Sequence, residues 1–196
     1  METKFAHQAR KKNFNHHQLE LIIGSLLGDG HLAKTTRGFA FRVNHGIKQK
    51  NYVDWKYRII KEFVNSTPCC YKNLYYFRTI SHPAFKRLRE RFYCGNKKIL
   101  PNDQYLKKYL TPFVLAVWIM DDGSRDGRQI RLNTQSFSKK ENEHLSSLLR
   151  ANLGIETTIN RDKNLFRLRV RNISMEKLIS ITKSFIIPSM FYKLSL

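Results

Sequence analysis

The sequence contains one short pattern twice: residues 22–30 read IIGSLLGDG, and residues 115–123 read LAVWIMDDG. In each copy an apolar run ends in Asp-Gly, with Asp29 in the first copy and Asp122 in the second. Apolar residues at helical spacing predict a buried helix, and the glycine after each aspartate predicts where that helix ends. The sequence therefore predicts two similar helices, each with one aspartate at its C-terminal end.

The segments that follow the two copies have the same order, as alternating and helical patterns of apolar residues indicate. In the first half the patterns predict a strand at 39–44, a helix at 52–64, a strand at 71–80 and a helix at 83–92. In the second half they predict a strand at 129–135, a helix ending at 153, a hairpin that includes 166–171, and a helix at 175–186. We therefore expect an α+β protein of two tandem repeats, residues 1–100 and 101–196.

Two glycines on the first motif helix, Gly24 and Gly28, lie four residues apart and leave one flank of the helix almost bare. We expect the second motif helix to approach closely at this flank. The residues of the second helix at this contact are Val117 and Asp121.

A carboxylate at the C-terminal end of a helix faces the negative end of the helix dipole, so a cation should lie beside it. If a pseudo-twofold axis relates the two halves, Asp29 and Asp122 meet and repel each other unless a metal ion neutralises them. The alternative is that each Asp-Gly is simply a helix-ending turn. The matching positions of the two copies favour a shared metal site.

The 196 residues include 36 Lys and Arg but 15 Asp and Glu, which gives a formal net charge of +21. Because 41% of the residues are hydrophobic, the chain can form a core, and its charge points to a polyanionic partner. On charge alone, a passive nucleic-acid binder such as a ribosomal protein is the first interpretation. No apolar run approaches the roughly 20 residues of a membrane span. The three cysteines, Cys69, Cys70 and Cys94, form neither a zinc pattern nor an even disulfide framework.

The polar faces of the predicted strands carry side chains that hydrogen-bond base edges in the major groove of DNA. These candidates are Arg42, Asn44, Arg78, Gln129, Arg131, Asn133, Gln135, Arg167, Arg169 and Arg171. Arg37 and Lys48 join them because residues 30–53 include basic residues but no acid. We expect about half of these residues to contact phosphate or solvent only.

The two copies resemble the paired signatures of the LAGLIDADG homing endonucleases, and the resemblance extends over nearly the whole chain. In particular, the chain resembles the single-chain, two-motif enzymes of yeast mitochondrial introns through YLTPFVLAVWIMDDG at 109–123, LNTQSFS at 132–138 and IIPSMFYKLSL at 186–196. Ser25, Val117 and Met120 depart from the family pattern, in ways that affect helix packing more than chemistry. The resemblance implies tandem αββαββα repeats whose two antiparallel sheets form a DNA-binding saddle.

By the same resemblance, the protein makes a double-strand break with short 3′ overhangs in a long, asymmetric target, by metal-dependent hydrolysis of phosphodiester bonds. Asp29 and Asp122 are the expected metal ligands, together with the backbone carbonyls of Gly28 and Asp121. An all-oxygen site of this kind suits Mg²⁺, with Mn²⁺ as a substitute.

Three further residues are implied at the active site. Lys98 in NKKILPN and Lys193 in MFYKLSL match basic positions that lie near the scissile phosphates in the family, where they would stabilise charge or organise water. Gln135 is a peripheral candidate.

Two alternatives to a homing endonuclease stay open. One is an intron maturase that binds structured RNA, with or without DNA cleavage. The other is a DNA-binding regulator without chemistry, against which the presence of both aspartates and both lysines argues. We expect a monomer on double-stranded DNA, no membrane partner, and an intracellular location in an organelle or a bacterial cytoplasm.

Overall fold

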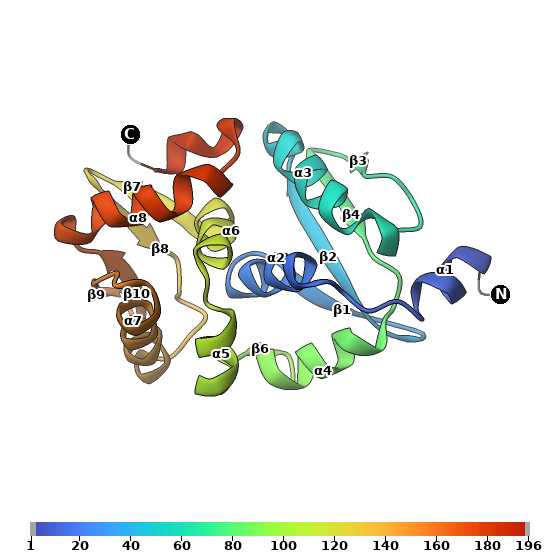
Figure 1. Cartoon of the computed structure of the whole chain (residues 1–196), viewed down its shortest axis with the longest axis horizontal. Coiled ribbons are helices and arrows are strands. Elements are labelled where there is room, and N and C mark those ends of the chain that lie inside the picture. The colour runs from blue at the N-terminus through green and yellow to red at the C-terminus, as the bar shows by residue number, and fades with distance from the viewer. Residues whose placement is uncertain (1–2, 195–196) are drawn as a thin grey trace.

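Two four-stranded antiparallel sheets flank a central pair of helices in the computed structural model (Figure 1). The structure describes residues 3–194; residues 1–2, and residues 195–196 at the end of the C-terminal motif, lie outside it. The first sheet has the strand order β1 (His31–Thr35), β2 (Gly38–Gly46), β4 (Leu74–Arg78), β3 (Cys69–Tyr71). The second has the order β7 (Gly123–Asp126), β8 (Gln129–Leu132), β10 (Leu165–Val170), β9 (Thr157–Asp162). The shared topology confirms the predicted α+β fold with two related antiparallel sheets.

The two motif helices, α2 (His16–Leu27) and α6 (Pro112–Asp122), lie side by side at the centre (Figure 1). The other helices are α1 (Lys4–Ala9), α3 (Lys50–Ile60), α4 (Pro83–Phe92), α5 (Asp103–Tyr109), α7 (Lys139–Leu153) and α8 (Met175–Thr182). Short 3₁₀ turns are η1 (Ile47–Gln49), η2 (Lys61–Phe63), η3 (Asn172–Ser174), η4 (Lys183–Phe185) and η5 (Pro188–Lys193). A small hairpin, β5 (Tyr93–Cys94) and β6 (Lys97–Lys98), precedes α5.

Local sequence signals fix both ends of the central helices. The Asn15 side chain accepts from the backbone N–H of Gln18, whose own side chain accepts from the backbone of Asn15. At the start of α6, the Thr111 hydroxyl accepts from the N–H of Val114, and Pro112 is the first helical residue. Both helices therefore begin and end where the sequence predicts, and their C-terminal ends carry the motif aspartates.

Close packing of α2 against α6 depends on the two glycines of α2. A Cβ atom on Gly24 would lie 2.8 Å from both the Val114 carbonyl oxygen and the Val117 Cβ. A Cβ atom on Gly28 would lie 2.5 Å from the Asp121 Cβ. These distances confirm the predicted close approach, because side chains at either position would force the helices apart.

The structure differs from the sequence prediction in several places. The single strand predicted at 71–80 is wrong: the segment is a hairpin, β3 and β4, with a turn at Lys72, whose φ of 53° is left-handed. Helices α1 and α5 were not predicted, because helices of six and seven residues are too short to show a clear period.

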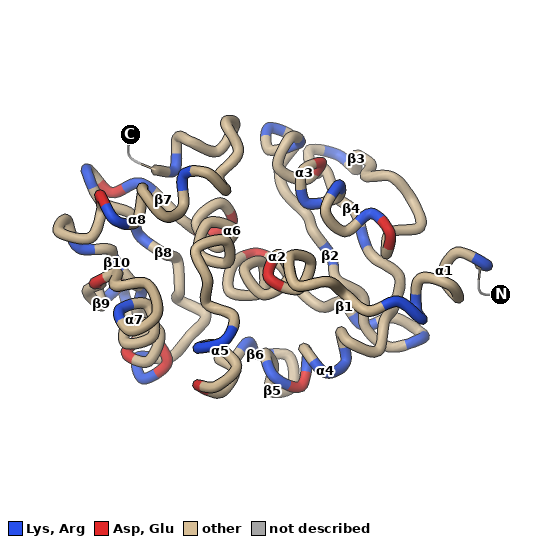
Figure 2. The backbone as a smooth tube through the Cα atoms, in the orientation of Figure 1, with Lys and Arg blue, Asp and Glu red and all other residues tan. Residues whose placement is uncertain are grey.

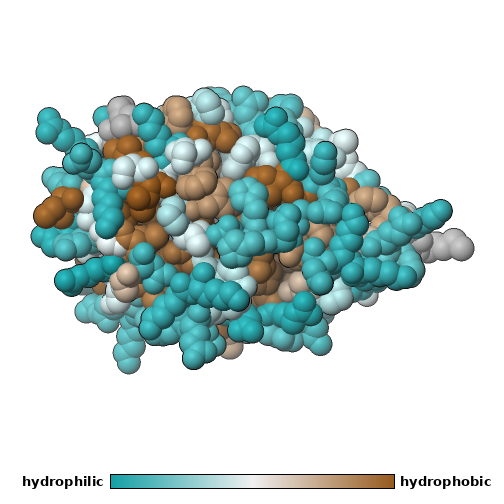
Figure 3. Space-filling view, in the orientation of Figure 1, coloured by the Kyte–Doolittle hydropathy of each residue, from teal (hydrophilic) through white to brown (hydrophobic). Residues whose placement is uncertain are grey.

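The core lies between each sheet and its helices and continues through α2 and α6, while the face shown in Figure 3 is mostly hydrophilic. Within residues 3–194, no helix is both long and apolar enough to cross a membrane. Cys69, Cys70 and Cys94 are exposed free thiols.

Candidate active site and nucleic-acid interface

The C-terminal ends of α2 and α6 bring Asp29 and Asp122 together. Asp122 is partly buried, whereas the Asp29 side chain is 50% exposed. Burial, the negative charges of Asp29 and Asp121, and a hydrogen bond between the Asp122 and Asp29 carboxyl groups raise the pKa of Asp122 to about 7. Such a pair holds a proton between its members, and a divalent cation can take the place of that proton.

The two lysines predicted at the site hold equivalent positions in the two halves. Lys98 Nζ donates to the Gly28 carbonyl oxygen at 2.5 Å, and Lys193 Nζ donates to the Asp121 carbonyl oxygen at 2.8 Å. Each lysine thus binds the residue before a motif aspartate. Burial lowers the pKa of both lysines, and the motif carboxylates oppose this effect. The structure therefore brings four of the five predicted catalytic side chains to one place.

The fifth, Gln135, has a different neighbour. Its Nε2 donates to Asp162 Oδ2 at 3.0 Å, on strand β9. This hydrogen bond directs the amide into the second sheet.

Asp121 is fully buried beside the site. Its Oδ1 lies 2.6 Å from Lys56 Nζ and 3.4 Å from His45 Nε2. Burial alone would raise the pKa of Asp121, but the positive charge of Lys56 and the hydrogen bond from His45 outweigh burial and lower it. The other ring nitrogen of His45, Nδ1, lies 4.0 Å from Asp29 Oδ2, so His45 connects the buried carboxylate with the exposed one.

The donor set of the site fits a hard divalent cation. The described residues contain no cluster of three or more His, Cys, Asp or Glu side chains arranged as a metal site. The oxygen atoms that could serve as donors there are the carboxylates of Asp29 and Asp122 and the main-chain carbonyls of Gly28 and Asp121. Each carbonyl oxygen has two lone pairs, of which a lysine ammonium uses one. Water or phosphate oxygens would complete the coordination, as is usual for Mg²⁺.

The candidates of the first sheet gather on its polar face. Arg42 lies opposite Arg78 across β2 and β4, and Asn44 lies opposite Tyr76. The Arg42 guanidinium lies 5.5 Å from the centre of the Tyr76 ring. Arg37 is in the turn between β1 and β2, and Lys48 is in η1.

In the second sheet, the predicted arginines pair with carboxylates. Arg131 Nε donates to Asp126 Oδ2 at 2.7 Å, and Arg169 Nε lies 2.9 Å from the same oxygen. Arg171 Nη1 lies 2.7 Å from Glu156 Oε2, and Arg167 Nη1 lies 3.5 Å from Asp162 Oδ2. A nucleic acid that binds these arginines therefore has to compete with carboxylates of the protein itself.

The remaining two candidates lie on or next to β8. The Asn133 side chain donates to the Asp122 carbonyl oxygen at 2.8 Å, which ties this strand to the active site. Gln129 is the first residue of β8, at the end of the strand away from Asp122. In Figure 2, lysine and arginine are spread over both halves, and acidic positions are fewer and include some on the central helices α2 and α6.

Sequence reasoning missed Lys56 and His45. Lys56 follows the apolar period of its helix, together with Tyr52, Val53 and Ile60, and a lysine at such a position is a signal for a buried charge with a partner. The identity of that partner, Asp121, has no local signal. His45 follows Asn44 in the strand and points to the buried side of the sheet.

Comparison with known proteins agrees with this geometry. A model of the LAGLIDADG DNA endonuclease family matches residues 19–178. The "Cytochrome b mRNA maturase bI2" of Saccharomyces cerevisiae is 32% identical over 90% of this chain and 47% of its own length. The "Probable intron-encoded endonuclease 1" of Wickerhamomyces canadensis is 31% identical over 90% of this chain and 83% of its own length. The chain thus spans about half of the first relative and most of the second.

Solved structures show the same fold. The homing endonuclease I-WcaI bound to its DNA recognition sequence has a TM-score of 0.87 and 29% identity, over 98% of this chain and 93% of that one. I-DmoI in complex with DNA and Mn has a TM-score of 0.54 and 18% identity, over 87% of this chain and 98% of that one. At that identity the second similarity concerns the fold alone.

Proposed function

The chain belongs to the LAGLIDADG DNA endonuclease family, and from this premise we propose that it is a site-specific homing endonuclease that makes a double-strand break in a long, asymmetric DNA target. The break leaves short 3′ overhangs. The observation that carries the proposal is the convergence of Asp29 and Asp122 between two lysines, each bonded to the residue before one aspartate. The 29% identity to a homing endonuclease bound to its DNA supports it.

The metal ligands in this proposal are Asp29, Asp122 and the carbonyls of Gly28 and Asp121, and the ion is Mg²⁺, with Mn²⁺ as a substitute. When bound, the ion polarises the phosphodiester and activates water. Lys98 and Lys193 keep the two carbonyls in place and add positive charge where a phosphate develops negative charge. Asn133 holds the Asp122 main chain from the adjacent strand.

DNA lies across the polar faces of both sheets in this proposal, and a single chain supplies both half-sites. In this proposal the repeats are residues 1–100 and 101–196, and the boundary lies in the connection between β6 and α5. Two unequal repeats on one chain favour a monomer and an asymmetric target, because neither half needs a second copy. The relatives' names, which refer to introns and to cytochrome b mRNA, support an organelle as the setting.

An intron maturase is the second candidate function. The observation that favours it is the 32% identity to a relative named as an mRNA maturase. Structured intron RNA would then use the same basic faces, with or without DNA cleavage.

The test of the proposed function is cleavage of a randomised duplex library with Mg²⁺, Ca²⁺ or EDTA, followed by sequencing of the ends. We expect double-strand breaks within one long motif, dependent on metal and with matching 3′ extensions. Asp29→Asn and Asp122→Asn should abolish double-strand cutting and leave binding largely intact, whereas Asp103→Asn, at an exposed position on α5, should cut normally. Absence of cleavage in a library that contains the insertion site would favour the maturase.

A further inference from the structure

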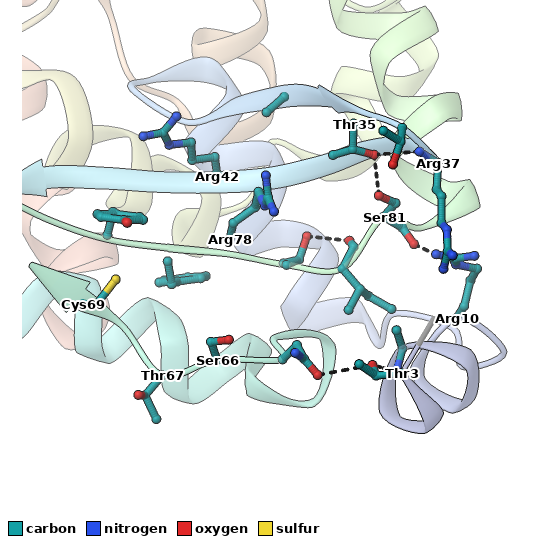
Figure 4. A pocket seen from close by; sticks show the side chains of 18 residues that line it. Thr3, Arg10, Thr35, Arg37, Arg42, Ser66, Thr67, Cys69, Arg78 and Ser81 are labelled. Atoms are coloured by element: carbon teal, nitrogen blue, oxygen red, sulfur yellow. Dashed lines mark hydrogen bonds between the residues drawn. The ribbon is translucent and has the colours of Figure 1, made fainter. Parts of the chain in front are cut away.

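A cavity of about 710 Å³ lies on the polar face of the first sheet, at the end of the sheet away from Asp29 (Figure 4). The small side chain of Ala33, on β1, lines it. Residues 65–67 form one wall, and Thr3, Ala6 and Arg10 from the N-terminal segment form another. Strands β2 and β4 complete it.

Four arginines from separate places in the chain line this cavity: Arg10, Arg37, Arg42 and Arg78. The described residues that line it include no Asp or Glu, but they include the hydroxyls of Thr35, Ser66, Thr67 and Ser81. Guanidinium and hydroxyl groups are donors, and guanidinium matches the geometry of phosphate oxygens. The lining therefore favours an anion with several acceptor oxygens.

One of these arginines is held in position by the chain itself. Arg10 Nε donates to the Ser81 carbonyl oxygen at 3.0 Å. The main chain next to it is fixed as well, because the Lys12 carbonyl oxygen and the His82 ring nitrogen Nε2 lie 2.9 Å apart. Arg10 is thus held at the cavity wall by an ordered support, which lowers the entropy cost of binding.

The second sheet has a smaller cavity of about 430 Å³ at the corresponding end. Its two arginines, Arg169 and Arg171, pair with Asp126 and Glu156. The described lining of the first cavity includes no Asp or Glu, whereas the arginines of the second lie beside carboxylates. The matched segment of the family model begins at residue 19, so Thr3, Ala6 and Arg10 belong to a part of this chain outside it.

We propose that the cavity of the first sheet binds backbone phosphates of the DNA target, and that Arg10 is one of the contacting groups. From Asp29 to Thr35 the chain advances six residues, about 20 Å at the rise of a strand. This corresponds to about six base pairs. The phosphates concerned thus belong to the outer part of one half-site, and the contact lengthens the target at one end. The proposal rests on the proposed function, because it takes duplex DNA on this face as given.

The experiment compares the effect of replacing Arg10 on binding to the full-length duplex with its effect on binding to shortened duplexes. Affinity is measured without cleavage, in EDTA, for the target recovered from the library and for two versions of it, each shortened at one end. Arg10→Gln removes the charge, and Arg10→Lys keeps it. Arg150→Gln, at an exposed position near the end of α7, is the matched control.

We expect Arg10→Gln to lower affinity for the full duplex about tenfold, the scale of a charged hydrogen bond. The slope of log K against log salt should become shallower by about 0.9, the value for one phosphate contact. Arg10→Lys should lose less affinity. On the duplex shortened at the first-repeat end, wild type and Arg10→Gln should bind equally, while shortening the other end leaves the tenfold difference.

Equal affinities of Arg10→Gln and Arg150→Gln for the full duplex would overturn the proposal. So would a loss that is the same on all three duplexes, since that indicates a structural effect. Cleavage is scored separately with Mg²⁺. If the wild type cleaves the target but either of these binding results is found, the phosphate-binding proposal is wrong and the proposed function still stands. If the wild type cleaves no DNA, the proposed function is wrong.

Discussion

Lys56 Nζ lies 2.6 Å from Asp121 Oδ1, and neither side chain is exposed to solvent. Asp121 belongs to the second motif helix, and Lys56 belongs to α3 of the first half, 65 residues away in the chain. The ion pair therefore joins the two halves at the base of the active site. His45, from β2 of the first half, contacts the same carboxylate oxygen.

The Lys56–Asp121 ion pair has no equivalent at the corresponding positions of the other repeat. In the second motif, the residue before the metal-site aspartate is Asp121. The first motif has a glycine, Gly28, at the equivalent position. Leu145 occupies the place in α7 that Lys56 occupies in α3, counted from the first residue of each helix. The surroundings of Asp29 and Asp122 are thus unequal, although Lys98 and Lys193 hold equivalent carbonyls.

Replacing Lys56 should destabilise the fold strongly. Lys56→Met keeps the length of the side chain but leaves the Asp121 carboxylate buried without its cation. Removal of one partner from a buried ion pair costs about 3–5 kcal/mol. Urea unfolding at neutral pH measures the change in the free energy of unfolding.

The control for this prediction is the double variant Lys56→Met with Asp121→Asn. It contains no unpaired charge, so it should recover most of the lost free energy. If Lys56→Met alone unfolds at the wild-type urea concentration, the ion pair contributes nothing, and the prediction is wrong.

Local features of this fold were predictable from the sequence, and contacts between distant segments were not. The spacing of Gly24 and Gly28 predicts the close approach of α6, because positions four apart lie on the same side of any helix. No local pattern could pair Lys56 with Asp121. The two lysines at the site were implied by resemblance, since Lys98 resembles any other lysine in so basic a chain.

The arginines of the second sheet show the same limit. Their alternation predicts a shared face, and the structure agrees. That Asp126 lies between Arg131 and Arg169 depends on the register of three strands, which alternation alone does not define.

Gly24→Ala should destabilise the interface of α2 and α6. The added Cβ lies 2.8 Å from the Val114 carbonyl oxygen, a backbone atom that moves only with its helix. Overpacking of this kind costs about 1–3 kcal/mol and outweighs the gain of about 1 kcal/mol in helix propensity. Thermal unfolding measures the result. Gly46→Ala, where nothing lies within 4 Å of the new Cβ, is the control and should leave stability almost unchanged.

Asp126→Asn should increase affinity for DNA. Asp126 contacts Arg131 and Arg169 on the predicted DNA-binding face, and its carboxylate competes with phosphate for them. Loss of that competitor should raise affinity about two- to fivefold, the scale of exposed ion pairs, and should steepen the dependence on salt. Fluorescence anisotropy with the duplex target tests this. Unchanged affinity would indicate that these arginines remain on the protein when DNA binds.

Metal affinity should depend on pH through Asp122. Its pKa is raised to about 7 by burial and by the neighbouring carboxylates, so Asp122 is protonated below that pH and charged above it. A cation binds the charged form and displaces the proton. Affinity for Mn²⁺ should therefore rise about tenfold per pH unit up to pH 7 and then level off.

Electron paramagnetic resonance of free Mn²⁺, without DNA, measures this affinity between pH 5.5 and pH 8.5, on the order of 1.5 units either side of the pKa. Asp122→Asn should bind weakly and show no such rise, whereas Asp103→Asn should follow wild type. A wild-type affinity that stays constant over this range contradicts the prediction, because it means that no proton leaves the aspartate pair when the ion binds. The same raised pKa predicts that, without metal, stability falls as pH rises from about 4 to about 7, since the folded state holds this proton more tightly than the unfolded state. Saturating Mn²⁺ should reduce that fall, because the ion compensates the charge that deprotonation creates.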